Sequence, residues 1–259
     1  MPIPIVDSHI HLFPASHLPT LAWYGPDSPL GSQHCIDEYR LATTSTPVSL
    51  QPESTSVGLA ERNPPKYLPQ YLRGFVFVET DRISSVEERR VPADAEGNEA
   101  DGWKHVLAEV DLLAKIIRGD TVDGDQYRRL DRPECLGVVA WAPVPGGAAV
   151  LERYMRRVRR EATGTEQEVA RKIRGVRYLV QDKPAGVMLK HAFIDGLRWL
   201  GRQGLTFDLG VDARQDGLNQ LREAVEMMKQ VYEDVDEDSQ VVIVISMGIS
   251  DIQIDIGCY

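Results

Sequence analysis

Short, nearly continuous apolar segments alternate along the chain with longer segments in which apolar residues recur every three or four positions. The first pattern is typical of strands buried on both faces, and the second is typical of amphipathic helices. Strands are predicted at residues 3–12, 71–80, 136–144, 173–180, 205–212 and 240–245. Helices are predicted at residues 103–118, 148–161, 186–202 and 215–234. Strands that alternate with helices in this way favour an α/β fold built on a parallel sheet.

Three segments between these elements show neither pattern. Residues 13–34 are rich in proline and glycine and predict a loop, which a short helical turn at residues 36–41 follows. Residues 42–66 are rich in Ser, Thr and Pro and predict an extended insertion, and residues 81–102 predict a charged loop. If the fold is a barrel, we expect the first loop to lie over its mouth, where loops carry substrate contacts.

Composition narrows the class of protein. The chain has 259 residues, enough for one large domain, and we expect a single domain over residues 1–259. The formal net charge of −10 argues against general binding to nucleic acid or to an anionic membrane. Five arginines form a basic face on the predicted helix 148–161, and a solvated exterior explains this face better than a nucleic-acid site does.

Cysteine usage and targeting signals indicate a compartment. Cys35, Cys135 and Cys258 are widely spaced and odd in number, so we expect free thiols in a reducing environment. No signal-peptide pattern opens the sequence, and no apolar run reaches about 18 residues. The expectation is a soluble, cytoplasmic protein that binds a small molecule, with the formation of a homo-oligomer left open.

The opening strand carries the strongest chemical signal. Because side chains alternate between the faces of a strand, Asp7, His9 and His11 are expected on one face, opposite Ser8 and Ile10. Two imidazoles at the end of one strand can reach a single divalent ion at about 2.0–2.1 Å. Two solvated histidines are the alternative, and the apolar strand that leads into the pair favours the functional interpretation.

These residues resemble the opening motif of the amidohydrolase superfamily. Val-Asp-Ser-His-Ile-His-Leu at 6–12, Leu-Ala-Trp-Tyr-Gly-Pro at 21–26, Gly-Val-Arg-Tyr-Leu-Val-Gln-Asp at 175–182 and Phe-Asp-Leu-Gly-Val at 207–211 are similar to the amidohydrolase-related branch, and within it to fungal sugar-lactonase-like members. The resemblance covers roughly residues 3–245 and is most specific in the opening motif. It implies a (β/α)8 TIM barrel of the metal-dependent hydrolase type, of which about six strand–helix units are present, with ligands at the carboxyl ends of the strands.

Further candidate site residues lie in the first loop and at two strand ends. Trp23 and Tyr24 could line a small-molecule pocket or anchor the loop on the rim. Glu79 could bind substrate or orient a ligand, although a solvated strand end explains it nearly as well. Arg177 suits a substrate carboxylate or a lactone carbonyl, because a guanidinium donates two hydrogen bonds at once, and an outward ion pair is the alternative.

The predicted strand 205–212 supplies two carboxylates on one face, Asp208 and Asp212. The family often has a histidine at this strand, and this sequence has none. A metal site of the multi-histidine kind is therefore in doubt, and we expect a divalent metal, Zn or Mn, to be bound weakly or not at all.

The resemblance breaks after Ile245. The family continues there with a segment like Asn-His-Leu and two further strands, the last bearing a catalytic aspartate, whereas this sequence continues Ser-Met-Gly-Ile. We expect a barrel that is incomplete at its C-terminal end, with a divergent tail at about residues 246–259. Open strand edges would expose unpaired backbone groups, so aggregation and loss of activity are expected of such a chain.

The resemblance implies hydrolysis of a small cyclic ester, either a sugar-acid lactone or a dicarboxylate lactone. His9 and His11 would bind a metal or polarise the carbonyl, Arg177 would bind the acid group, and Asp208 or Asp212 would serve as the base. Two alternatives stay open: a metal-dependent decarboxylase of a small aromatic or enol acid, and a non-catalytic remnant that binds a ligand or a partner.

Overall fold

The structure is a computed structural model that describes residues 3–25, 27–44, 70–87, 89–90, 100–120, 122, 124, 134–161, 167–211 and 218–247. Within this part of the chain, no helix is both long enough and apolar enough to cross a membrane.

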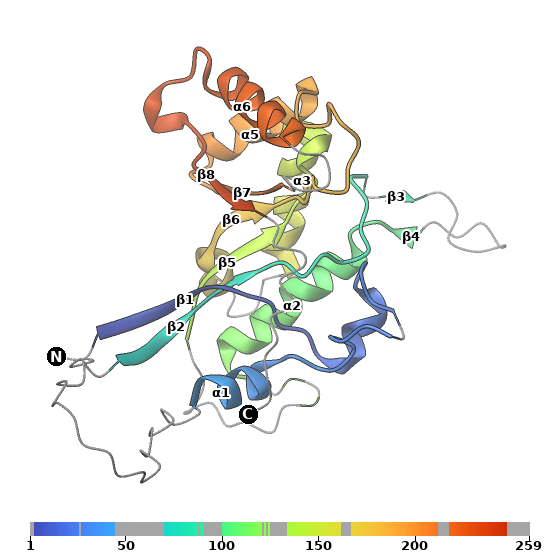
Figure 1. Cartoon of the computed structure of the whole chain (residues 1–259), viewed down its shortest axis with the longest axis vertical. Helices are drawn as coiled ribbons and strands as arrows, with labels where there is room; N and C mark the ends of the chain where they lie inside the picture. Colours follow the sequence, from blue (N-terminus) through green and yellow to red (C-terminus); the bar gives the residue numbers. More distant parts are fainter. Residues whose placement is uncertain are drawn as a thin grey trace, which may run out of the picture.

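A single six-stranded parallel sheet organises the described residues (Figure 1). Its strands are neighbours in the sheet in the order in which they follow in the chain, as in a TIM barrel. They are β1 (Ile3–Ile10), β2 (Gln70–Val78), β5 (Glu134–Trp141), β6 (Ile173–Arg177), β7 (Thr206–Val211) and β8 (Ile243–Met247). Every neighbouring pair is parallel. The prediction of a TIM-barrel type of fold with six strand–helix units is therefore confirmed.

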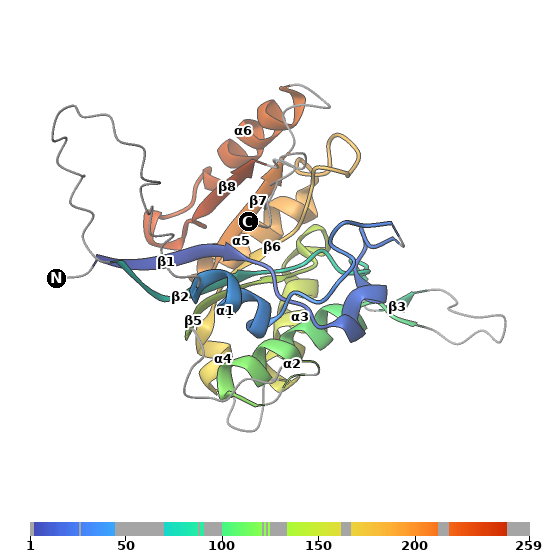
Figure 2. The same cartoon turned by 60° about the horizontal axis from the view of Figure 1, so that its bottom comes forward.

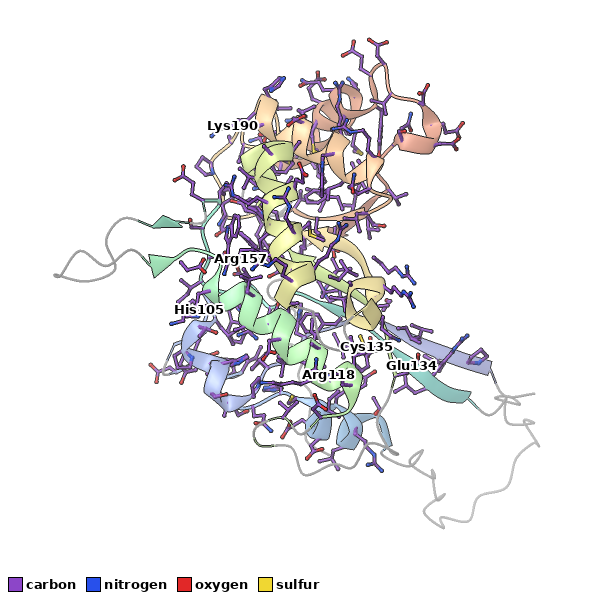
Figure 3. All side chains as sticks on the ribbon, turned by 180° about the vertical axis from the view of Figure 1, so that it is seen from behind. His105, Arg118, Glu134, Cys135, Arg157 and Lys190 are labelled. Carbon is purple, nitrogen blue, oxygen red and sulfur yellow. The ribbon has the colours of Figure 1, made fainter. Side chains whose placement is uncertain are left out.

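Helices connect these strands and cover the outer side of the sheet. They are α1 (Ile36–Thr44), α2 (Lys104–Arg118), α3 (Gly147–Glu161), α4 (Gln167–Lys172), α5 (His191–Arg202) and α6 (Asn219–Tyr232), with short 3-10 turns at Ala15–Thr20, Val144–Gly146 and Glu237–Ser239. Figure 2 shows α2, α3 and α4 below the strands and α6 beside β7 and β8. Seen from behind in Figure 3, α2 and α3 lie across the sheet, and the labelled His105, Arg118 and Arg157 mark these two helices.

Buried aromatic rings join the helical layer to the sheet. Trp103 at the start of α2 and Trp141 in β5 both contact Tyr154 of α3 edge to face, with centroid distances of 5.2 and 5.4 Å. All three side chains are almost completely buried. Burial of such large rings, together with their edge-to-face geometry, stabilises the packing of α2 and α3 on β5.

Close backbone approach between β2 and β5 requires a glycine. A Cβ atom at Gly74 would lie 2.1 Å from the backbone oxygen of Glu134, a distance that no side chain tolerates. Gly74, in the middle of β2, therefore lets this strand pair with the amino end of β5.

Several element boundaries differ from those predicted. The helix expected from residue 186 begins at His191, because residues 181–190 form turns. The Glu223 carboxylate accepts the backbone N–H groups of Gly186 and Met188 at 2.7 and 3.0 Å and holds that segment outside the helix. The predicted loop 81–102 contains a short antiparallel pair, β3 (Arg89–Arg90) and β4 (Ala100–Asp101).

The helical turn predicted at residues 36–41 is the start of α1, which runs to Thr44. Most of the insertion predicted at residues 42–66 lies outside the described residues.

Candidate active site

A cavity of about 770 Å³ lies at the carboxyl ends of the strands. Its walls come from the end of β1 and the loop that follows, from the residues just after β2, from β6 and the residues after it, and from β8. The lining residues are His9, His11, Phe13, Trp23, Leu30, His34, Glu79, Thr80, Asp81, Arg177, Leu179, Gln181 and Ser246. This volume suits a small-molecule ligand, and the edge of the sheet is the one at which α/β barrels bind their ligands.

The two histidines of the opening motif meet in this cavity. Their ring centroids are 5.0 Å apart and the ring planes are nearly perpendicular, at 82°. Strand alternation thus brings the two imidazoles together, as their spacing in the sequence predicts.

The Asp7 carboxylate lies next to the histidine motif and to α1, and its Oδ1 accepts the backbone N–H of His9 at 3.4 Å. The pairing of β1 with β2 shifts register between Asp7 and Ile10. Asp7 Oδ2 accepts a hydrogen bond from the Tyr39 hydroxyl of α1 at 3.3 Å, and Asp7 does not line the cavity.

A backbone carbonyl fixes the tautomer of His11. Its Nδ1 lies 2.9 Å from the Val78 oxygen, which can only accept, so Nδ1 carries the hydrogen and the neutral ring leaves Nε2 as an acceptor. His11 as a residue is exposed to solvent, but the protein atoms that surround its ring lower its pKa to about 4. Burial and then the Arg177 guanidinium lower the pKa of His9 as well. Both imidazoles are therefore neutral at pH 7.

Glu79 and Arg177 face each other across the floor of the cavity. Arg177 Nε lies 3.9 Å from Glu79 Oε1, too far for a hydrogen bond, and both side chains are largely buried. The other carboxylate oxygen, Oε2, accepts the backbone N–H of Asp81 at 2.6 Å. Burial, reinforced by the nearby Glu109 carboxylate, raises the pKa of Glu79 to about 8, so Glu79 is mostly protonated at pH 7.

Asp208 lies beside Arg177 in the sheet. The two residues are cross-strand partners in the β6–β7 pair, so their side chains share a face. Asp208 is 5% exposed and is not among the residues that line the cavity, although its charge acts on the imidazole of His9, which does line it. Gly210, two residues further along β7, leaves room for the neighbouring Leu179 side chain, because a Cβ atom there would lie 2.8 Å from Leu179 Cδ2.

Three buried polar atoms in this group lack a hydrogen-bond partner in the structure: Glu79 Oε1, Arg177 Nε and Asp208 Oδ1. Buried polar atoms in proteins are almost always paired, so three unpaired atoms on one floor indicate a place where a ligand or ordered water supplies the missing partners.

The first loop supplies an aromatic wall. Trp23 lines the cavity, and its Nε1 donates a hydrogen bond to the Thr80 carbonyl at 2.9 Å. Trp23 thus both lines the pocket and anchors the loop, which were the two alternatives for it. Tyr24 is 37% exposed and is not part of the lining. Asp212 lies outside the described residues.

A buried network ties this loop to the end of β2. The Ala22 N–H donates to the Asp81 carbonyl, and the Ile83 N–H donates to the Thr20 carbonyl, each at 2.8 Å. Arg82, which is 1% exposed, donates from Nη1 to Thr20 Oγ1 and from Nε to the Glu109 carboxylate, again at 2.8 Å. Two loops that carry cavity residues are therefore held against each other before any ligand binds.

The chain is similar to the L-rhamnono-gamma-lactonase of Scheffersomyces stipitis. The two are 27% identical over 227 residues, which are 88% of this chain and 57% of the lactonase. This similarity supports the resemblance to lactonase-like amidohydrolases that the sequence shows. The chain spans little more than half the length of this relative.

Among solved structures, the chain is similar to an amidohydrolase 2 from Bifidobacterium longum subsp. infantis, with a TM-score of 0.45, 17% identity, and coverage of 94% of this chain and 60% of that one. It is also similar to an amidohydrolase from Burkholderia multivorans with bound zinc, with a TM-score of 0.41, 15% identity, and coverage of 87% and 65%. Both scores are below 0.5, so the fold assignment rests on the strand order of the sheet. No protein-family model matches the chain.

The sequence did not identify His34 as a site residue, although it lines the cavity. It lies in a proline- and glycine-rich loop, where no periodicity shows which way a side chain points. Its partner Phe13, on the other side of the same loop, was not identified for the same reason.

The described residues do not complete a metal site. No group of three or more His, Cys, Asp or Glu side chains among them is placed to hold one ion. Zinc usually takes three or four protein ligands, and His9 and His11 supply two.

Proposed function

We propose that this chain carries the active site of a hydrolase that opens a small, hydroxylated lactone of the sugar-acid type. The observation that carries the proposal is a group of three buried side chains: Glu79 and Arg177, which line the cavity, and Asp208, the cross-strand neighbour of Arg177. Each has a buried polar atom without a hydrogen-bond partner. The three atoms belong to an acid that is mostly protonated, a permanent cation and an aspartate, which can supply a general acid, an oxyanion donor and a general base for ester hydrolysis. The similarity to a lactonase supports this reaction class.

Charge on the lining supports a neutral substrate over a dicarboxylate. Arg177 is the one lysine or arginine among the described lining residues, and Glu79 and Asp81 lie on the same wall. A dicarboxylate lactone would bring two negative charges to one cation, so its second carboxylate would find no counter-charge among the described lining residues. A sugar-acid lactone in its ring form carries no charge and offers hydroxyl groups instead.

In the proposed reaction, water attacks the carbonyl carbon of the lactone and the ring C–O bond breaks. Arg177 donates from Nε to the carbonyl oxygen, where negative charge develops. Asp208 accepts the proton of the attacking water, and Glu79 gives its proton to the departing ring oxygen. The product is an open-chain hydroxy acid. The raised pKa of Glu79 suits this role, because the group still holds its proton at pH 7.

The role proposed for His11 differs from the metal binding or carbonyl polarisation that the sequence suggests for the two histidines. A neutral His11 with hydrogen on Nδ1 has no donor left to polarise a carbonyl, so its Nε2 is proposed to accept a hydrogen bond from the attacking water. With two imidazoles and no third ligand among the described residues, a divalent metal is expected below one equivalent per chain, and no step here depends on it.

The experiment is proton release in a pH-stat. Purified protein is supplied in turn with aldonic-acid lactones, dicarboxylate lactones and a small aromatic acid. The open strand edges alone predict a loss of activity, but Glu79, Arg177 and Asp208 lie together in the folded sheet, so we expect acid production from the aldonic lactones. Asp208→Asn should reduce kcat at least about 100-fold, as loss of a general base does. A matched control is Asp111→Asn on the exposed face of α2, which should leave kcat unchanged. Failure to hydrolyse any lactone above the blank refutes the proposal, and release of carbon dioxide from the aromatic acid would establish a decarboxylase instead.

A further inference from the structure

His34 forms part of the cavity wall supplied by the first loop, together with Phe13 and Trp23. We propose that His34 is a specificity-determining residue whose Nε2 accepts a hydrogen bond from a hydroxyl group on the substrate ring. The inference rests on the proposed function and deepens it, because it names the group that distinguishes a hydroxylated lactone from a plain one.

The hydrogen-bonding state of His34 is set by its own loop. Its Nδ1 lies 2.8 Å from the carbonyl oxygen of Ser32, and a carbonyl can only accept. The hydrogen of the neutral ring is therefore on Nδ1, which leaves Nε2 as a free acceptor. Since Nδ1 is occupied within the loop, Nε2 is the polar atom that the ring can offer to a ligand in the cavity.

The ring is held in place without a ligand. His34 and Phe13 exchange two backbone hydrogen bonds, at 2.7 and 3.0 Å, and their rings are 5.3 Å apart. Phe13 in turn contacts Trp23 edge to face at 5.7 Å, and Trp23 is anchored to the Thr80 carbonyl. A chain of contacts thus runs from the end of β2 to His34. An acceptor fixed in this way costs little entropy when it binds a partner.

Acceptor and donor are complementary on the two walls. Arg177 Nε on β6 is an unpaired donor suited to the lactone carbonyl, and His34 Nε2 on the loop is an acceptor suited to a hydroxyl hydrogen. A lactone with ring hydroxyls can satisfy both atoms, whereas an unsubstituted lactone satisfies only the first. Sites built to pair with a hydroxyl reject analogues that lack it, because the polar atom of the protein then loses its partner.

The test measures binding rather than turnover, and it uses non-hydrolysable γ-lactams. Calorimetry compares a dihydroxy γ-lactam with unsubstituted pyrrolidinone on the whole chain. His34→Phe keeps an aromatic ring against Phe13 and removes both nitrogens. We expect its affinity for the dihydroxy lactam to fall about 2- to 12-fold, the range of one neutral hydrogen bond, with the affinity for pyrrolidinone unchanged. His34→Gln, which restores an acceptor oxygen, should recover part of the loss.

The control is His191→Phe at the exposed start of α5, outside the cavity lining, which should bind both lactams as the wild type does. Wild-type affinity of His34→Phe for the dihydroxy lactam, or an equal loss for both lactams, overturns the inference, and so does a wild type that binds neither. Should His34→Phe fail to fold, His34→Leu takes its place in the same comparison. A wild type that binds the dihydroxy lactam through His34 but hydrolyses no lactone refutes the proposed function alone.

Discussion

Removal of the Glu109 carboxylate tests whether the buried network behind the cavity holds the fold together. Glu109 is 2% exposed, and its Oε1 accepts hydrogen bonds from Arg82 Nε at 2.8 Å and from the backbone N–H of Thr80 at 3.2 Å, as well as from the Thr80 hydroxyl. Glu109→Ala leaves the Arg82 charge buried without its counter-charge. It also leaves both Thr80 donors without an acceptor.

The size of the effect follows from that burial. Breaking a buried ion pair by removing one partner costs about 3–5 kcal/mol, and the free energy of unfolding of a whole domain is only about 5–15 kcal/mol. At about 2–4 °C per kcal/mol for a chain of this size, the melting temperature should fall by about 6–20 °C. Glu109→Gln keeps an oxygen acceptor and the shape of the side chain, so its loss should be smaller than that of Glu109→Ala.

The measurement is urea and thermal unfolding followed by circular dichroism. The exposed pair of Arg156 with Glu152 on α3 provides the control, because its side chains are 67% and 60% exposed. Glu152→Ala should cost no more than about 0.5 kcal/mol. If Glu109→Ala and Glu152→Ala change the free energy of unfolding by the same small amount, the network does not stabilise the fold and the reasoning is wrong.

Four further predictions concern the site and its strands. Arg177→Ala should lower kcat/KM for a hydrolysed lactone roughly 10-fold or more, as loss of a charged donor to the developing oxyanion does, and steady-state kinetics that are unchanged across a lactone panel would remove Arg177 from the site. The pKa of Glu79 is about 8 in the folded chain against 4.5 ordinarily, so between these two pH values the folded chain binds a proton that the unfolded chain has released. The free energy of unfolding should therefore fall as the pH rises from 4.5 to about 8. Glu79→Gln should flatten that slope in urea titrations at several pH values, and an unaltered slope counts against the assignment. Elemental analysis after dialysis should return less than one zinc per chain, and a full equivalent that His9→Ala abolishes would contradict this. Gly74→Ala should lower the melting temperature, because its Cβ would overlap the Glu134 carbonyl oxygen, and a wild-type melt would show that the strands can separate to admit it.

The sequence predicts most strongly where local periodicity decides the structure. Alternation along β1 brings His9 and His11 together, and the ends of the apolar runs place Glu79 and Arg177 at the carboxyl edge of the sheet, where both line the cavity. These outcomes depend on neighbours in the chain and on the shared direction of parallel strands. Whether these residues act as proposed stays a prediction.

Contacts between distant segments explain what the sequence does not predict. The register shifts of β1 against β2 are a property of the two strands together and cannot be seen in either strand alone. The hydrogen bond from Tyr39 of α1 to Asp7 likewise joins two elements that are distant in the sequence. The Glu223 carboxylate, which belongs to α6, binds the backbone of Gly186 and keeps the residues before His191 out of α5. His34 reaches the cavity only because its loop folds back on Phe13. In each case a long-range contact overrides the local pattern.

The position of β1 in the sheet determines which part of the molecule unfolds first. Among the described strands β1 pairs with β2 alone, and its register is interrupted twice. Terminal strands with few neighbours exchange their amide hydrogens through small local openings that leave the rest of the domain intact. In native-state hydrogen exchange, the amides of β1 should therefore exchange faster than those of β5. Because His9 and His11 lie on or next to this strand, mild denaturant should disassemble the cavity before the sheet melts, so ligand binding should be lost at lower urea than secondary structure.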